Sequence, residues 1–174
     1  GIPGSVGGAI YMNAGAYGGE MKDVVTGVYM ITDGELKYYS AEKMDFSYRH
    51  SIVQGLKNAI VVTAEFKLAP GKREEIEEKI KELNTRRSEK QPLEYPSAGS
   101  TFKRPETGYA SQLIEEAGLK GIRVGGAEIS KKHSGFIINA DNATAKDVKE
   151  LISYVQKVVE EKSGVKLYPE VKML

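Results

Sequence analysis

The amino-acid sequence predicts an α+β protein with an antiparallel sheet in its first part and a separate α+β domain in its second. In residues 24–32, β-branched and aromatic side chains precede Asp33-Gly34, which is a hairpin signal. A Pro70-Gly71 break is followed by a long charged segment, which indicates a domain boundary. We therefore expect these parts in order: a first unit of 1–71, a connecting helix of 72–90, a second unit of 91–164 and a terminal strand, 165–174, that returns to the first unit.

The first part of the chain is typical of a glycine-rich turn followed by sheet. Pro3 and the small residues of GIPGSVGGA, residues 1–9, favour a turn that leads into a short helix. Strands are predicted over residues 24–32, 35–39 and 59–68.

Helical patterns dominate after residue 71. In the charged helix Lys72–Lys90, the residues Ile76, Ile80 and Leu83 are spaced to form one packed stripe. Residues 91–105 resemble a Pro, Gly and Ser loop. The remaining predicted elements are a helix over 109–117 ended by Gly118, strands over 122–129 and 135–139, and a helix from Thr144 to about Lys162 with Thr144 and Asp147 as a capping box.

Composition excludes several classes of function. The 174 residues carry a formal net charge of +1, so no global basic field attracts nucleic acid. Cys is absent and the two histidines, His50 and His133, are far apart, so we expect no disulfide, no thiolate chemistry and no metal site. No apolar run approaches the roughly 20 residues that cross a membrane, and we expect a cytoplasmic protein. Because the sequence opens on Gly-Ile-Pro-Gly without Met, we expect a fragment of a longer chain.

Two segments of the first part could bind a ligand. Backbone N–H groups of the glycine-rich opening suit a phosphate or a flavin edge, although the same glycines would also serve a tight turn. Arg49, in the segment Tyr48-Arg49-His50-Ser51, has the side chain best shaped to hold a carboxylate through two parallel hydrogen bonds. The alternative is a surface loop in which Arg49 pairs with a carboxylate of the protein.

Two segments of the second part carry candidate side chains. Ser100 follows a glycine and precedes the cations Lys103 and Arg104. A serine hydroxyl can protonate a carbanion, or it can simply cap a turn. No His/Asp pair is positioned by the sequence to make Ser100 a nucleophile, so we set a hydrolase aside. Glu170, near the end of the chain, is either an acid in a site or an outward-facing polar residue.

Together these four segments resemble the UDP-N-acetylenolpyruvoylglucosamine reductase family, in the family's order. GIPGSVGGAIYMNAGAYGGE resembles its flavin-domain signature, YRHS its arginine motif, SAGSTFKRP its serine motif and PEVK its terminal motif. The stretch from Gly118 to Val148 resembles its substrate-binding domain. Because no extra tyrosine-bearing loop is present, the sequence is closer to the second subtype.

The resemblance implies an NADPH-dependent flavin reductase that converts UDP-N-acetylglucosamine enolpyruvate to UDP-N-acetylmuramate for peptidoglycan. It implies that Arg49 and Glu170 polarise the substrate carboxylate and that Ser100 protonates the α-carbon. It implies substrate-binding roles for Tyr48, Lys103 and Arg104. The FAD-binding residues that it implies are Pro3, Gly4, Ser5, Gly8, Asn13, Gly15, Ala16, Tyr17 and Gly18.

In this family a further subdomain, on the order of a hundred residues, precedes these segments and completes the flavin site. The first unit then resembles one part of a PCMH-like flavin-binding fold, with the missing subdomain as its partner. We expect this chain alone to be purified without flavin. Two other functions remain open: a catalytically silent module that binds UDP-sugar, and another flavoprotein of the vanillyl-alcohol-oxidase-like group, against which the Ser100 and Glu170 motifs argue.

Overall fold

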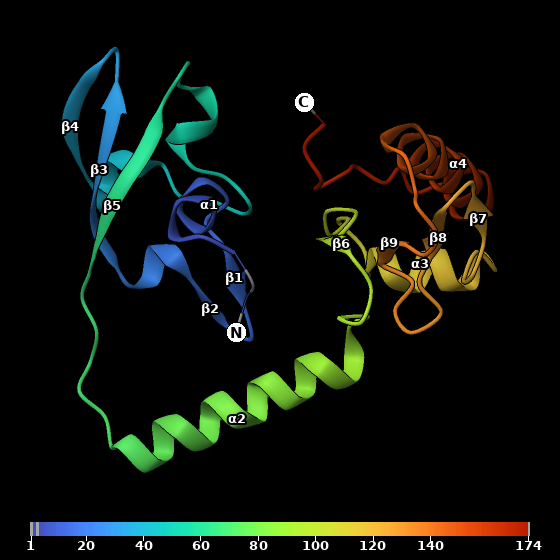
Figure 1. Ribbon diagram of the computed structural model, residues 1–174, viewed down its shortest axis with the longest axis horizontal. Helices are drawn as coiled ribbons and strands as arrows, with labels where there is room; N and C mark the ends of the chain where they lie inside the picture. The colour runs from blue at the N-terminus through green and yellow to red at the C-terminus, as the bar shows by residue number, and fades with distance from the viewer. Residues whose placement is uncertain (1, 3, 174) are drawn as a thin grey trace. The chain divides into compact units, whose positions relative to one another are not determined.

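A computed structural model describes residues 2 and 4–173, and its chain divides into two compact units (Figure 1). Unit 1 is Gly1–Leu83 and unit 2 is Asn84–Leu174. The division falls inside the helix that the sequence predicts as a connector. Among the described residues, no helix is long and apolar enough to cross a membrane.

Unit 1 is built on an antiparallel sheet in which β3 lies between β4 and β5. Its elements, in chain order, are α1 (Val6–Tyr11), β1 (Gly15–Ala16), β2 (Gly19–Glu20), the 3₁₀ turn η1 (Met21–Asp23), β3 (Val25–Thr32), β4 (Glu35–Ser40), η2 (Ala41–Met44), η3 (Ile52–Gly55), β5 (Ile60–Phe66) and the start of α2 (Arg73–Lys90). Asp33 and Gly34 join β3 to β4 with φ of 54° and 79°, as a tight hairpin turn requires. The three predicted strands of the first part are confirmed within two residues at each end.

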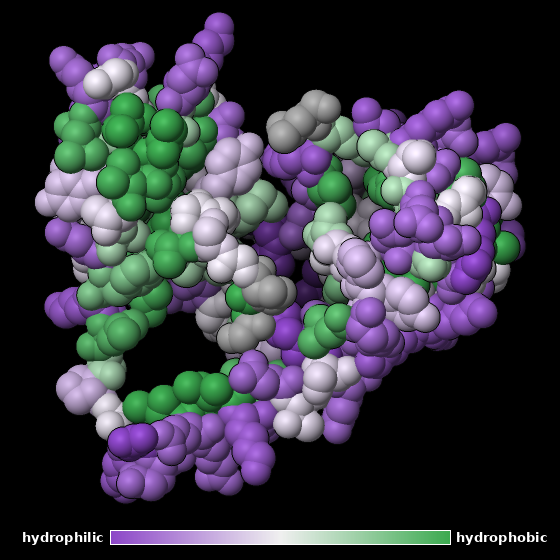
Figure 2. Space-filling model, in the orientation of Figure 1, coloured by the Kyte–Doolittle hydropathy of each residue, from purple (hydrophilic) through white to green (hydrophobic). Residues whose placement is uncertain are grey.

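The core of unit 1 lies between α1 and one face of this sheet. Its fully or nearly fully buried side chains are Ile10, Val25, Val28, Met30, Met44 and Val53. On the other face, Leu36 and Ile60 both pair with Ile31, and their side chains are 61% and 58% exposed. Apolar side chains gather on the surface of this unit (Figure 2). The sheet therefore buries one face and leaves apolar side chains exposed on the other.

Helix α2 forms as predicted, but its apolar stripe is not packed. Ile76 and Ile80 are 47% and 53% exposed, and no residue of α2 is buried. Ion pairs one turn apart stabilise it instead, including Arg73 with Glu77 at 2.7 Å and Lys79 with Glu82 at 2.8 Å. The spacing of apolar residues therefore predicted the helix correctly and its burial wrongly.

Unit 2 is a four-stranded antiparallel sheet in the order β6-β9-β8-β7, with two helices. Its elements after α2 are β6 (Ser97–Ser100), α3 (Ala110–Glu116), β7 (Arg123–Val124), β8 (Ala127–Ile129), β9 (Phe136–Asn139) and α4 (Ala145–Ser163). Ile114 of α3, Leu151 and Val155 of α4, and Ile129 and Ile137 of the sheet share one buried core. The predicted α+β fold with antiparallel sheets is confirmed.

Both helices of unit 2 begin and end as their sequences indicate. Thr144 accepts a hydrogen bond from the backbone N–H of Asp147, whose carboxylate accepts one from the N–H of Thr144, so the capping box is confirmed. Gly118 follows α3 with φ of 74°. The ends of α3 and α4 were therefore predictable from local side chains.

Three segments of unit 2 differ from the sequence prediction. Residues 122–129 form a hairpin rather than one strand, because the chain turns at Gly125-Gly126. A Cβ at Gly126 would lie 1.9 Å from the carbonyl oxygen of Asp141, so only glycine fits there. The predicted loop 91–105 contains β6, which pairs with distant β9. In residues 165–173, where the sequence predicts a strand, the structure has only an isolated bridge, between Pro169 and Phe102.

Candidate active site

The glycine-rich opening folds into a short capped helix and a tight hairpin. Ser5 caps α1 by accepting a hydrogen bond from Gly8 N at 3.1 Å. Strands β1 and β2 then pair closely around Tyr17 and Gly18. A Cβ at Gly15 would lie 2.8 Å from the carbonyl oxygen of Gly19, so the hairpin needs glycine there. Pro3, the first of the predicted flavin-binding residues, lies outside the described residues.

Asn13 is fully buried at the start of this hairpin and uses its amide inside the protein. Its Nδ2 donates to the carboxylate of Glu20 and to the carbonyl oxygen of Ser47, and its Oδ1 accepts from Lys22 N at 2.9 Å. Glu20 also forms a hydrogen-bonded ion pair with Lys22 that raises the pKa of the lysine amine. Asn13 therefore anchors the hairpin and holds the turn of Ser47, which limits what it can offer a ligand.

Arg49 lies in the turn that Asn13 anchors. The turn is closed by backbone hydrogen bonds between Ser47 and His50, and the carbonyl oxygen of Arg49 accepts from Gln54 Nε2 at 3.0 Å. Arg49 Nη2 donates to the carbonyl oxygen of Gly15 at 3.4 Å. Its guanidinium lies 5.0 Å from the ring centre of Tyr48. The structure thus brings the arginine motif and the glycine-rich hairpin together.

The backbone of this region is strained at two site residues. Among the described residues, seven non-glycine residues have a left-handed φ, and all but two are the Asn and Asp residues that tolerate it. The two exceptions are Tyr17, with φ of 54°, and Arg49, also 54°. Residues held in such a conformation against their preference tend to occur at functional sites.

In unit 2, Ser100 and Glu170 lie on adjacent extended segments. Ser100 ends β6 and pairs with Phe136 of β9. On the other side, Glu170 N donates to the carbonyl oxygen of Thr101 at 2.8 Å, and Lys103 N donates to that of Tyr168 at 2.8 Å. Ser100 is exposed and Glu170 half-buried. The backbone segments that carry Ser100 and Glu170, which are distant in sequence, therefore lie side by side.

The predicted substrate-binding side chains are accessible. Tyr48 is 52% exposed, Lys103 is half-buried, and Arg104 is exposed with its guanidinium 4.4 Å from the ring centre of Tyr109. Within the described part of the chain, no three His, Asp or Glu side chains gather closely enough to hold a metal ion. Arg49 belongs to unit 1, and Ser100 and Glu170 belong to unit 2.

The chain is similar along its whole length to known proteins. Residues 91–174 match the family model described as UDP-N-acetylenolpyruvoylglucosamine reductase, C-terminal domain. Over its whole length the chain is 59% identical to the UDP-N-acetylenolpyruvoylglucosamine reductase of Caldanaerobacter subterraneus and 56% identical to that of Lactiplantibacillus plantarum. The chain belongs to the UDP-N-acetylenolpyruvoylglucosamine reductase family. It covers 58% of the length of each of these two reductases.

A solved structure of the family agrees with the fold. The crystal structure of UDP-N-acetylenolpyruvylglucosamine reductase from Thermus caldophilus matches 99% of this chain and 61% of its own chain, with a TM-score of 0.85 and 41% identity. The family that the four motifs predicted is therefore confirmed. The chain corresponds to somewhat more than half of a reductase of this family.

The opening segment would contact a flavin mainly through its backbone atoms. The side chains of Ser5 and Asn13 are engaged within the protein, whereas Tyr17 is 50% exposed and a Cβ at Gly4 or Gly18 would meet no atom within 4 Å. An extended aromatic ligand could approach such an open backbone closely. The residues present are thus compatible with one side of a flavin site.

Sequence reasoning overlooked two sets of residues in this reductase-family chain. Gln54 also donates to the carbonyl oxygen of Tyr11 at 3.0 Å, so it joins α1 to the Arg49 turn, but an isolated glutamine gives no signal of that role. Arg123 and Glu128 form an ion pair across the β7–β8 hairpin. The Gly125-Gly126 pair was a turn signal that could have revealed the hairpin.

Proposed function

We propose that this chain is the larger part of an NADPH- and FAD-dependent reductase that converts UDP-N-acetylglucosamine enolpyruvate to UDP-N-acetylmuramate for peptidoglycan synthesis. The observation that carries the proposal is the pairing of the Ser100 segment with the Glu170 segment, in a chain 59% identical to a protein named for this reduction. A proton donor next to a carboxyl is what the second half of such a reduction needs.

Ser100 is the proton donor. When bound, the flavin supplies a hydride, taken from NADPH, to the β-carbon of the enolpyruvyl ether. Negative charge then develops on the α-carbon and the attached carboxylate. The Ser100 hydroxyl gives its proton to the α-carbon, which completes reduction of the double bond, and the serine regains a proton from solvent. The conjugate acid of the carbanion is so weak that even an alcohol can serve as the donor.

Arg49 and Glu170 stabilise the charge that develops. Arg49 binds the substrate carboxylate with its guanidinium, and Glu170 hydrogen-bonds the same group as a neutral acid or through a shared proton. The strained turn supports the role of Arg49, because its backbone is fixed by Asn13 and Gln54 before any substrate binds. This mechanism requires the three side chains to reach one three-carbon group.

The remaining predicted residues orient the substrate. Lys103 and Arg104 bind the diphosphate or the carboxylate of the UDP-sugar, and Tyr48 orients the enolpyruvyl group. Gly4, Gly8, Gly15, Ala16, Tyr17 and Gly18 present backbone to the flavin, while Ser5 and Asn13 shape that backbone. We place the reaction in the cytoplasm, which fits the absence of Cys from the sequence.

The proposal can be tested in an extended protein. The segment that precedes the matching region in the Caldanaerobacter subterraneus reductase would be fused ahead of residue 1. We expect the fusion to bind FAD and to consume NADPH only when the enolpyruvyl substrate is present, with UDP-N-acetylmuramate detected by mass spectrometry. A folded, flavin-loaded fusion that forms no such product would refute the proposed function.

The chain by itself is better described by the second candidate, a UDP-sugar-binding module without flavin. Two observations support this candidate: the chain covers only 58% of the relative's length, and the side chains of Ser5 and Asn13 are engaged within the protein. We expect the purified chain to be colourless and to bind the UDP-sugar. Stoichiometric flavin in its visible absorbance spectrum, or no binding of UDP-N-acetylglucosamine in a titration, would contradict this candidate.

A further inference from the structure

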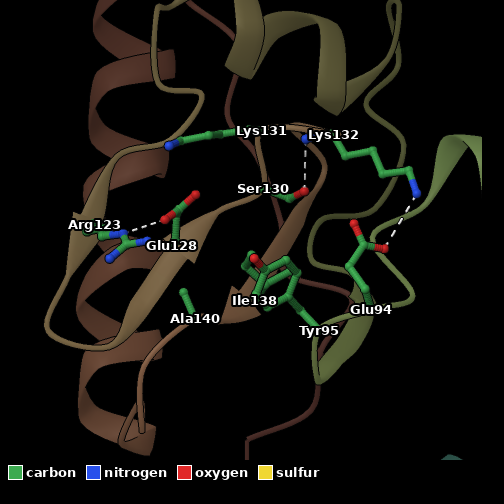
Figure 3. A pocket seen from close by; sticks show the side chains of 9 residues that line it. All are labelled: Glu94, Tyr95, Arg123, Glu128, Ser130, Lys131, Lys132, Ile138 and Ala140. Atoms are coloured by element: carbon green, nitrogen blue, oxygen red, sulfur yellow. Dashed lines mark hydrogen bonds and ion pairs between the residues drawn. The ribbon is translucent and has the colours of Figure 1, made fainter.

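Unit 2 contains a cavity on the face of its sheet that α3 and α4 do not cover. Ile129 and Ile137 pack into the helix-facing core, so their neighbours Glu128 and Ile138, which pair across β8 and β9, face the other way. The cavity has a volume of about 200 Å³ (Figure 3). Its walls are formed by Glu94, Tyr95, Arg123, Glu128, Ser130, Lys131, Lys132, Ile138 and Ala140.

Glu128 is a buried carboxylate in the floor of this cavity. The residue is 4% exposed, and its carboxylate accepts a hydrogen bond from Nε of Arg123, whose side chain is 55% exposed. Burying an ion pair gains little stability compared with apolar side chains of the same size. A carboxylate at this position therefore suggests that its role is to hold the arginine in one orientation.

Glu128 binds only the Nε side of the Arg123 guanidinium group, and the side with the two Nη nitrogens faces away from that bond. Among residues 2 and 4–173, neither of its two Nη nitrogens has a hydrogen-bond partner. With Nε fixed by Glu128, the planar group is already oriented, so a ligand would not have to order it. Two parallel N–H donors match the two oxygens of a carboxylate or of a phosphate.

Lys131 supplies a second cation near Glu128. Figure 3 shows Arg123 and Lys131 on two sides of this glutamate. The stem of Lys131 lies on Gly121, where an added Cβ would be 3.2 Å from its Cε, and no partner for its amine occurs among the described residues. Lys132 differs, because its amine donates to the carbonyl oxygen of Ser88 at 2.8 Å and to Glu94 at 3.4 Å.

The charges of the cavity favour an anion. Three cations and two carboxylates line it, and three minus two leaves a net charge of +1. Both carboxylates already have a cationic partner, whereas Lys131 and the Nη side of Arg123 have no anionic partner among the described residues. A cationic ligand would meet like charge, and a neutral one would leave these donors unsatisfied.

We propose that this cavity is an oxyanion-binding site, in which Arg123 and Lys131 bind a phosphate or carboxylate group and Glu128 positions Arg123. The volume admits such a group with a small organic part, which Tyr95 and Ile138 contact. The site uses residues of unit 2 that the proposed reductase mechanism does not use. It therefore stands or falls independently of flavin binding and of turnover.

Calorimetric titration of the chain with inorganic phosphate, and separately with acetate, at constant ionic strength tests the proposal. We expect saturable anion binding that depends on Arg123 and Lys131, and the anion whose binding these residues strengthen more identifies the group that the site prefers. Lys131→Ala and Arg123→Gln should each weaken that binding by about tenfold or more, since each removes charged hydrogen bonds. Arg123→Lys keeps the charge but loses the paired donors, so it should also weaken binding.

Lys146→Ala is the matched control, because Lys146 is an exposed lysine of α4 that pairs with Glu150 at 3.7 Å. It should bind the anion like the parent chain. Circular dichroism would verify folding, and Lys131→Ala alters only an exposed side chain. The proposal is overturned if neither anion binds saturably, if Lys131→Ala binds like the parent chain, or if Lys146→Ala weakens binding equally. An Arg123→Lys variant with full affinity would overturn the positioning role of Glu128.

Discussion

The backbone N–H of Glu170 donates to the carbonyl oxygen of Thr101 over 2.8 Å. Thr101 directly follows Ser100, and Ser100 pairs with Phe136 on its other side. The end of the chain is thereby held against the segment that carries the proposed proton donor. A change in either segment should therefore affect the geometry of the other.

Ser100→Ala in the extended protein should separate the two halves of the reaction. Flavin reduction by NADPH should stay nearly unchanged, because Ser100 takes no part in it. Reoxidation by the enolpyruvyl substrate should slow by at least about 10², the usual contribution of a positioned proton donor. Stopped-flow absorbance of the flavin measures both rates.

Ser97→Ala provides the control for that experiment, since Ser97 begins the same strand, β6, and loses the same hydroxyl. It should leave both half-reactions close to those of the parent. Equal slowing of both halves by Ser100→Ala would show that Ser100 supports the structure rather than the chemistry.

A crystal structure of the extended protein with substrate should place Arg49, Ser100 and Glu170 around the same enolpyruvyl group. Their functional atoms should lie within roughly 10 Å of one another, because each must come within hydrogen-bonding reach of three carbon atoms and their carboxylate. Any one of the three on an opposite face of an intact fold would refute the assigned mechanism.

Asn13→Ala should destabilise unit 1 more than an equivalent change elsewhere. It leaves the carbonyl oxygen of Ser47 and the N–H of Lys22 without their amide partner, at a cost of about 1–3 kcal/mol. Asn142→Ala is matched, since Asn142 also has a left-handed φ but is exposed. Urea unfolding measures the free energy of unfolding of both variants relative to the parent. Equal losses of stability in the two variants would mean that backbone conformation alone explains the Asn13 effect.

The stability of unit 2 should fall as the solution is acidified, because burial, reinforced by the charge of Lys120, lowers the pKa of His133. The unfolded chain, with its histidine pKa of about 6.5, then takes up the proton more readily than the folded chain. The contribution of His133 to the stability of unit 2 is therefore complete above the unfolded pKa of about 6.5, and it is lost as the pH falls toward the lower pKa of the folded state. We expect the free energy of unfolding, measured between about pH 5 and 8, to depend less on pH in His133→Gln than in the parent. In the control His50→Gln, the pH dependence due to His133 should remain.

Local signals in the sequence were enough for much of the fold. β3 is formed by its own β-branched residues and Asp33-Gly34, and α4 begins at the box of Thr144 and Asp147. β6 could not be found in this way, because its Ser and Gly residues are extended only through pairing with β9. The exposure of Ile76 and Ile80 also depends on what surrounds α2, which no local pattern describes.

Family motifs name the residues of the candidate site. The roles of Arg49, Ser100 and Glu170 stay predictions from those motifs, and the pairing of the Ser100 and Glu170 segments emerges only in three dimensions. Gln54 gave no such signal, because its role depends on hydrogen bonds to residues that the sequence alone does not place beside it. Arg123 and Glu128 belong to no motif, and only the Gly125-Gly126 turn signal could have placed them side by side.

Among the described residues, Tyr17 and Arg49 are the two whose backbone is left-handed against preference, and they limit how far the protein can be stabilised by redesign. Optimising each turn for its backbone alone would replace both with glycine or asparagine and relieve about 1 kcal/mol at each position. Such a chain would be more stable but would lose the Tyr17 ring and the Arg49 guanidinium at the glycine-rich hairpin. Redesign of this protein should therefore keep Tyr17 and Arg49 in spite of their strained backbone.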